Sequence, residues 1–159
     1  MLFRSAKYIV ASLAAYKKGD RKHPTMRAIA TSLTDQDMAD LAAYYEQQAK
    51  DGAPAAQAAP VPSPAVAELL KKGNCASCHG ENFNKPIDPS YPKLAGQHAD
   101  YLYYALKAYQ VDKNPQVGRN NAIMVGMAKP FTHAELKQVA AYLATLPTEL
   151  KTVPQSRFR

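Results

Sequence analysis

Tryptophan is absent from the chain, cysteine occurs only twice, and no hydrophobic run is long enough to span a membrane as a helix. Cys75 and Cys78 are too close together to close a useful disulfide loop, so a disulfide scaffold is excluded. Lysine and arginine are scattered, and no nucleic-acid-binding motif accompanies them, which argues against a nucleic-acid partner. The two cysteines therefore point to a metal, a redox dithiol or a haem.

The composition is that of a folded, basic protein. Hydrophobic residues make up 47% of the chain, enough to build a packed core. The net charge is +7 and the isoelectric point is near 9.4. This balance predicts solubility and weak docking to acidic protein surfaces.

The N-terminus does not resemble a secretory signal peptide. Arg4 and Lys7 precede an apolar run over residues 8–15, but this run is short and rich in tyrosine. Residues 16–19 read Tyr-Lys-Lys-Gly, where a signal peptide would carry a cleavage site of small residues.

A linker divides the chain into two pieces. Residues 52–64 combine spaced prolines with alanines and almost no charge, which predicts a semi-extended segment. The expected domains are therefore an N-terminal piece over residues 1–51 and a C-terminal domain over residues 65–159.

The C-terminal domain shows helical patterns only. A short helix is expected from Pro64 to Lys72, and an amphipathic helix begins after His98. Thr132 and Glu135 form a capping box that starts a further helix. No segment alternates with the period of a strand, so the expected fold class is all-α. Two stretches rich in turn-forming residues are expected to be loops, namely 84–96 and 114–130.

The N-terminal piece repeats the order of the C-terminal domain. The matching residues are Tyr8, Leu13, Ala15 and Tyr16 with Tyr101, Leu106, Ala108 and Tyr109, Met26 with Met124, Ala30 with Ala128, Thr34 with Thr132, and 42–44 with 140–142. The copy is incomplete because no Cys-x-x-Cys-His precedes it. Residues 1–51 are therefore interpreted as the rear part of a second unit.

Residues 75–79 read Cys-Ala-Ser-Cys-His, which is the strongest signal in the chain. On a helix, Cys75, Cys78 and His79 share one face, so two thiols and an imidazole can address one planar ligand. This spacing is typical of covalent haem c attachment, with His79 on the iron. A zinc site would need two further ligands at similar spacing, and a thioredoxin-like dithiol would need a βαβ setting. The chain offers neither.

Haem iron held by His79 needs a second axial ligand, and the expected one is Met124 in the loop over 114–130. Met127 is the alternative. Met26 occupies the matching place in the repeat, and this alignment favours Met124. A thioether ligand stabilises ferrous iron and suits electron transfer.

These motifs resemble the cytochrome c4 family, dihaem proteins whose two halves each have a class I cytochrome c fold. The resemblance covers residues 65–147 and, in truncated form, residues 5–50. It implies a complete cytochrome c fold preceded by a partial copy, and a carbonyl of Pro92 that orients the axial His79. The motifs that carry it are 75–80, 91–98, 123–127 and the helix from Thr132.

The departure from the family is the missing first haem motif, so one haem is expected. Covalent haem attachment follows export, so a periplasmic location is expected although no signal peptide is present. Both absences lead to the expectation that the natural protein begins upstream of Met1.

The expected function is single-electron transfer in a respiratory chain, without enzymatic activity of its own. The expected partners are a quinol-oxidising complex and a terminal oxidase with acidic docking surfaces. Peripheral membrane association stays open. Two alternatives also stay open: a haem subunit of a larger oxidoreductase, with a broad apolar patch, and a peroxidase or gas sensor in which Met124 is not a ligand. Residues 1–50 are expected to be loosely packed, to pair with a second chain, or to rest on the haem domain.

Overall fold

The computed structural model describes residues 5–47 and 58–148. Within these residues the fold is helical apart from one pair of two-residue strands, which confirms the expected all-α class. The linker expected over 52–64 lies outside the described residues as far as 57. Its described part, 58–63, forms no helix or strand.

The N-terminal half consists of α1 (Ala6–Lys18), β1 (Arg21–Lys22), α2 (Pro24–Ser32) and α3 (Asp35–Gln47). The Ser5 side chain caps the start of α1, and Gly19 ends it with a left-handed φ of 91°. Helix α1 packs against both α2 and α3. Between residues 5 and 47, the buried hydrophobic residues are few, namely Ala30, Met38 and Ala42.

The C-terminal half consists of α4 (Pro64–Lys72), α5 (Cys75–His79), α6 (Ala99–Ala108), β2 (Gly118–Arg119), α7 (Ala122–Ala128) and α8 (His133–Thr145). Helices α6 and α8 pack on each other, and α4 lies against α8. The capping box of Thr132 and Glu135 begins α8 as expected. The core joins helices to the loop before α6 through Phe83, Ala95, Leu102, Val139, Ala140, Leu143 and Leu146.

The expected loop over 114–130 is wrong, because it contains β2 and helix α7. The Asn121 side chain accepts a hydrogen bond from the Met124 backbone at 3.1 Å and so begins the helix. Tertiary contacts complete it, since Gln110 Nε2 donates to the carbonyl oxygens of Ala128 and Phe131 at 2.8 and 2.7 Å. A seven-residue helix with Ile, Val and Gly in its interior shows no clear period, which explains the error.

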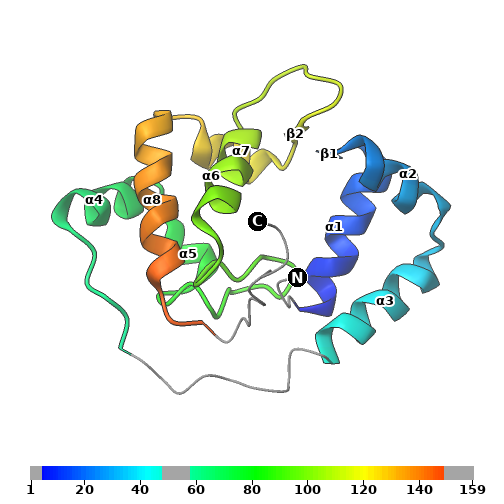
Figure 1. Cartoon of the computed structure of the whole chain (residues 1–159), viewed down its shortest axis with the longest axis horizontal. Coiled ribbons are helices and arrows are strands. Elements are labelled where there is room, and N and C mark those ends of the chain that lie inside the picture. Colours follow the sequence, from blue (N-terminus) through cyan, green and yellow to red (C-terminus); the bar gives the residue numbers. More distant parts are fainter. Residues whose placement is uncertain (1–4, 48–57, 149–159) are drawn as a thin grey trace, which may run out of the picture.

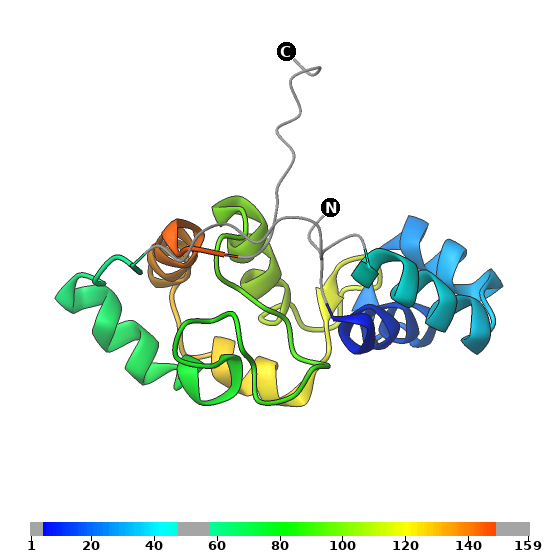
Figure 2. The same cartoon turned by 90° about the horizontal axis from the view of Figure 1, so that it is seen from below.

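The internal repeat appears in the order of the helices, with α1–α2–α3 matching α6–α7–α8. The caps of the matching helices α2 and α7 also correspond, since His23 accepts from Met26 as Asn121 accepts from Met124. Strands β1 and β2 pair antiparallel, with Arg21 opposite Arg119. Figures 1 and 2 show the two halves side by side with this strand pair between them. The N-terminal half therefore rests on the haem-motif half.

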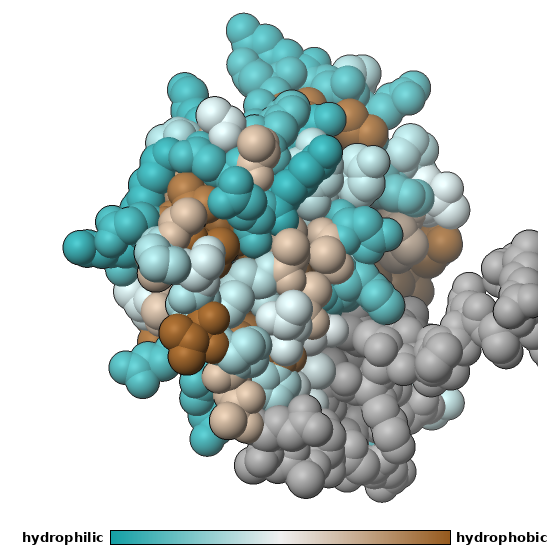
Figure 3. All heavy atoms as spheres, turned by 60° about the vertical axis from the view of Figure 1, so that its left-hand side comes forward, coloured by the Kyte–Doolittle hydropathy of each residue, from teal (hydrophilic) through white to brown (hydrophobic). Residues whose placement is uncertain are grey.

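The surface in Figure 3 carries mostly hydrophilic side chains, with small hydrophobic spots that are separate from one another. Among the described residues, no helix is both long and apolar enough to span a bilayer.

Candidate functional site

Helix α5 forms one wall of the site. Asn74 precedes it with a left-handed φ of 45°, and Ser77 Oγ donates to the Asn74 carbonyl oxygen at 2.7 Å. The helical spacing places Cys75, Cys78 and His79 around one cavity, as the motif predicts. Both cysteines are free, half-buried thiols.

His79 is 7% exposed, and the backbone orients its ring. Its Nδ1 lies 3.0 Å from the carbonyl oxygen of Pro92. A carbonyl oxygen can only accept, so Nδ1 carries the hydrogen in this contact. Nε2 is then the imidazole nitrogen with the lone pair that a metal needs.

The segment after α5 folds tightly back beneath it. Gly80 has a φ of +79°, and a Cβ built there would lie 2.2 Å from the carbonyl oxygen of Lys85. The Ile87 backbone donates to the Cys78 carbonyl oxygen at 3.1 Å. Phe83, at 3% exposure, anchors the turn in the core. This close approach requires glycine directly after the histidine.

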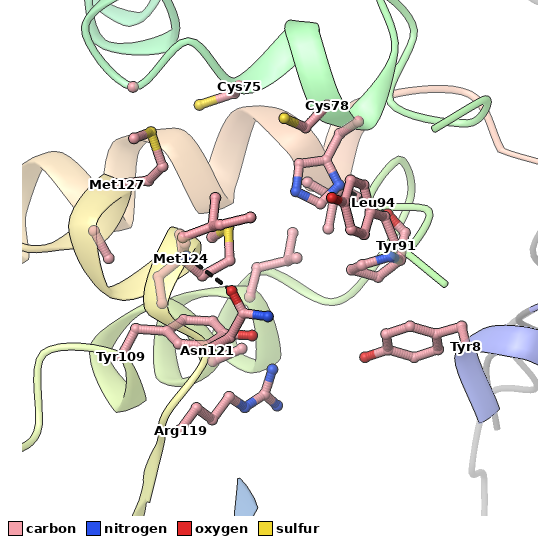
Figure 4. Close-up of a pocket in the computed structure, with 18 of the residues that line it drawn as sticks. Tyr8, Cys75, Cys78, Tyr91, Leu94, Tyr109, Arg119, Asn121, Met124 and Met127 are labelled. Carbon is pink, nitrogen blue, oxygen red and sulfur yellow. Dashed lines mark hydrogen bonds between the residues drawn. The ribbon is translucent and has the colours of Figure 1, made fainter. Parts of the chain in front are cut away.

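Helix α7 forms a second wall and carries both candidate methionines. Met124 is half-buried and its side chain projects into the cavity, whereas Met127 is 43% exposed and lies on the side of Cys75 (Figure 4). Both residues line the cavity. Their counterpart Met26 lies in α2 and does not line it.

The cavity has a volume of about 440 Å³ and is mainly apolar. Its walls come from α5, α6, α7 and α8 of the C-terminal half and from α1 of the N-terminal half. Tyr91 and Leu94 close it beside α5 (Figure 4). The apolar lining includes Leu94, Leu102, Leu106, Phe131, Val139 and Leu143.

The chemistry of this donor set fits a covalently bound haem. Burial raises the pKa of the Cys75 thiol, so this thiol is neutral at pH 7 and compatible with an apolar cavity. Two thiols that share one helix face can add to the two vinyl groups of a porphyrin. A buried imidazole beside them supplies an iron ligand. The apolar side chains that line the cavity keep water away from the haem. No cluster of His, Cys, Asp and Glu that could hold a bare metal ion occurs among the described residues.

Sequence reasoning missed the polar end of the cavity. Arg119 from β2 and Tyr8 from α1 point into it from the end away from Cys75 and Cys78 (Figure 4). Arg21 also lines the cavity. The sequence signal for the two arginines is weak: the offset that matches Met26 with Met124 also matches Arg21 with Arg119. The pairing of β1 and β2 brings them to the site.

Comparisons with known proteins agree with this arrangement. The cytochrome c family pattern matches residues 64–147. The cytochrome c4 of Thiocapsa roseopersicina is 39% identical over 92 residues, 58% of this chain and 44% of that protein. The thiosulfate dehydrogenase electron acceptor of Stutzerimonas stutzeri is 28% identical over 148 residues, 89% of this chain and 67% of that protein. A solved cytochrome c4 from Acidithiobacillus ferrooxidans matches with a TM-score of 0.66 at 27% identity, covering 91% of this chain and 87% of that chain.

The fold and the site together define a c-type cytochrome. The chain belongs to the cytochrome c family, in its cytochrome c4 branch, and binds haem c covalently. This confirms the expected family, fold and cofactor. The chain spans less than half the length of the Thiocapsa relative.

Proposed function

We propose that the protein transfers single electrons through one haem c, joined to Cys75 and Cys78 and ligated by His79 and Met124. The observation that carries the proposal is a buried imidazole and a methionine that line the same apolar cavity as two free thiols. When bound, the haem supplies a one-electron iron couple. The protein holds the ligands and keeps the cavity dry.

His79 is suited to the proximal position by its contact with Pro92. The Nδ1–H donated to this carbonyl sets the tautomer and the ring angle, and it makes the imidazole a stronger ligand. Because the carbonyl belongs to a backbone that packs into the core, the ring cannot easily swing away. A fixed ligand lowers the reorganisation that accompanies a change of one electron.

Met124 is suited to the distal position because α7 is held at both ends. Asn121 caps its start, and Gln110 binds carbonyls at its end. Met127 is 43% exposed, so a large part of its side chain faces solvent instead of the cavity. A thioether ligand favours ferrous iron and raises the reduction potential, as an electron carrier in an oxidising compartment requires.

The proposed setting is the periplasm, since covalent haem attachment follows export. The proposed partners are a quinol-oxidising complex and a terminal oxidase with acidic docking surfaces that complement the net charge of +7. The name of one relative, an electron acceptor of thiosulfate dehydrogenase, supports a second candidate donor, a dehydrogenase of sulfur compounds. In this proposal residues 65–159 form the haem domain, residues 52–64 the linker and residues 1–51 the partial copy.

The experiment that tests the proposal is an optical spectrum of the purified protein, oxidised and reduced, extended into the near infrared. We expect a sharp reduced α-band and, in the oxidised form, a weak charge-transfer band from methionine sulfur to iron. Met124→Ala should abolish the charge-transfer band and lower the reduction potential. Met127→Ala, the matched control on the same helix, should keep both.

Two results would contradict the assignment. A high-spin spectrum of the wild-type protein that shifts with carbon monoxide would favour the peroxidase or gas-sensor alternative. Loss of the charge-transfer band in Met127→Ala, with the band retained in Met124→Ala, would transfer the ligand role to Met127.

A further inference from the structure

Two arginines, Arg21 and Arg119, stand at the polar end of the haem cavity. Arg21 and Arg119 line the cavity together with Asp20, the one carboxylate among its described lining residues. Asp20 forms its ion pair with Lys18 instead, at 3.0 Å. Neither arginine forms an ion pair with a described carboxylate. Two fixed positive charges therefore face a largely apolar space.

The strand pair holds these arginines together. Arg21 lies opposite Arg119 in the β1–β2 register, one from each half of the molecule. Both guanidinium groups donate to the hydroxyl oxygen of Tyr101, at 3.0 and 3.3 Å. Arg21 also lies 4.7 Å from the ring centre of Tyr16, and Arg119 lies 5.5 Å from that of Tyr109. Two like charges that meet at one phenol repel each other, and an anion between them offsets this repulsion.

The chemistry of this pair selects carboxylates. A guanidinium presents five N–H donors in a planar fork that matches a carboxylate in bidentate fashion. The Tyr101 oxygen uses one donor of each group. Arg21 Nη1 also donates to Ser12 Oγ at 3.2 Å and to the Tyr8 hydroxyl at 3.5 Å, so these acceptors of the two guanidinium groups are all neutral hydroxyls. The other ionisable groups that line the cavity away from α5 are the phenols of Tyr8, Tyr101 and Tyr109 and the paired Asp20, and none of these neutralises two positive charges.

We propose that Arg21 and Arg119 bind the two carboxylate groups of the haem, so that the N-terminal half completes the haem site of the other half. The inference rests on the proposed function. Haem carries its carboxylates on the edge away from the vinyl groups that cysteines bind. The thiols of Cys75 and Cys78 therefore direct the carboxylates to the opposite end of the cavity, where Arg119 enters (Figure 4).

This arrangement gives the arginines two effects. Their charges oppose the additional positive charge of ferric iron, which raises the reduction potential. Their ion pairs also tie the two halves to one ligand, because Arg21 belongs to the first half and Arg119 to the second. The haem is then shared across the strand pair.

The test compares Arg21→Gln and Arg119→Gln with Lys22→Gln, which also removes one positive charge. Lys22 follows Arg21 in β1 but does not line the cavity. The ratio of reduced to oxidised haem is measured against a redox dye at fixed potential. We expect each arginine variant to lower this ratio by roughly tenfold and Lys22→Gln by less than about twofold, because solvent screens a charge outside the cavity. Arg119→Lys, which keeps the charge, should restore most of the ratio.

A pH titration of the potential supplies a readout that a merely structural role would not change. Arginine lowers the pKa of a carboxylate that it binds, so its loss should shift the pH-dependent part of the potential curve to higher pH. Circular dichroism and the haem-to-protein ratio verify that each variant folds and retains its haem. If Arg119→Gln does not fold, the comparison of Arg21→Gln and Arg119→Lys with the wild type decides whether the arginines bind the haem carboxylates.

Equal ratios and unchanged pH profiles in Arg21→Gln, Arg119→Gln and Lys22→Gln would overturn the proposal. The wild-type spectrum separates this outcome from a failure of the proposed function. Absent haem or a high-spin spectrum would refute the function, whereas a normal low-spin spectrum with unresponsive arginine variants refutes only the carboxylate contact.

Discussion

Single residues determine how closely the backbone approaches the haem attachment helix. Gly80 combines φ +79° with ψ 157°, a region open essentially to glycine. The Lys85 carbonyl oxygen fills the space that a side chain would need. A Cβ built on Gly73, before α5, would lie 2.9 Å from the Cys75 sulfur and 3.0 Å from the Phe131 ring. Glycine on both sides of the motif therefore lets the thiols and the imidazole meet in one cavity.

Gly80→Ala should destabilise the protein by about 1–3 kcal/mol, because alanine rarely adopts this conformation and its methyl group meets Lys85. Gly126→Ala is the matched control. It lies in the exposed interior of α7, and a Cβ there meets nothing within 4 Å. We expect it to stabilise by roughly 0.5–1 kcal/mol, as alanine replaces glycine in a helix. Urea denaturation measures the free energy of unfolding of both variants. An unchanged free energy in Gly80→Ala would contradict the expectation.

At the scale of elements, α8 depends on its N-terminal cap. Thr132 Oγ1 accepts from the Glu135 backbone at 3.2 Å, and the Glu135 carboxylate accepts from the Thr132 backbone at 2.6 Å. Lys72 of α4 donates to the same carboxylate at 3.0 Å. One carboxylate therefore caps α8 and ties it to α4, the helix that leads into the haem motif.

The cap predicts a pH dependence of stability. The Thr132 backbone and Lys72 lower the pKa of Glu135 from 4.5 to about 2. Since the folded-state pKa lies below the unfolded one, the carboxylate stabilises the fold above pH 4.5, and this stabilisation is lost as the pH falls toward 2. Thermal unfolding from pH 7 to 2 should show Glu135→Gln less stable than wild type at pH 7, with the difference vanishing near pH 2.

The control for this titration is Glu68→Gln, an exposed glutamate of α4. Its unfolding curve should follow that of the wild type across the range. A constant difference between wild type and Glu135→Gln down to pH 2 would show that the ionised carboxylate does not stabilise the cap.

At the scale of the molecule, the haem cavity is large relative to the two small cores around it. The cavity of about 440 Å³ is lined mainly by apolar side chains, and without haem these side chains would face water at a cost in hydrophobic free energy. A whole domain is typically stable by only about 5–15 kcal/mol. The C-terminal half is therefore expected to depend on haem for its fold. Helix α1, which lines the same cavity, would lose its contact with the haem as well.

Removal of the haem tests this dependence. The variant with Cys75→Ser and Cys78→Ser, purified without haem, should lack a cooperative thermal transition and show reduced helical circular dichroism at 25 °C. The holoprotein, prepared in parallel, should unfold cooperatively. A haem-free chain that melts as sharply as the holoprotein would contradict the expectation, since it would show that the helices pack without the cofactor.

Local signals in the sequence predicted most of the C-terminal half. The Cys-x-x-Cys-His motif, the capping box before α8 and the proline and glycine that bound α4 each act within a few residues, so they can be read directly. The haem, the family and the helices α4, α6 and α8 follow from them. Helix α7 could not be predicted in this way, because its C-terminal end depends on Gln110, a residue outside the helix.

The sequence by itself determined the cofactor, the attachment residues and the helical class, because covalent haem binding requires a short motif on one helical turn. Only the tertiary structure decided what surrounds the haem. Helix α1 lines the cavity, and Arg21 meets Arg119 across β1 and β2, strands of two residues each with no period to read. Such contacts join residues far apart in the chain, and their positions depend on how the two halves pack.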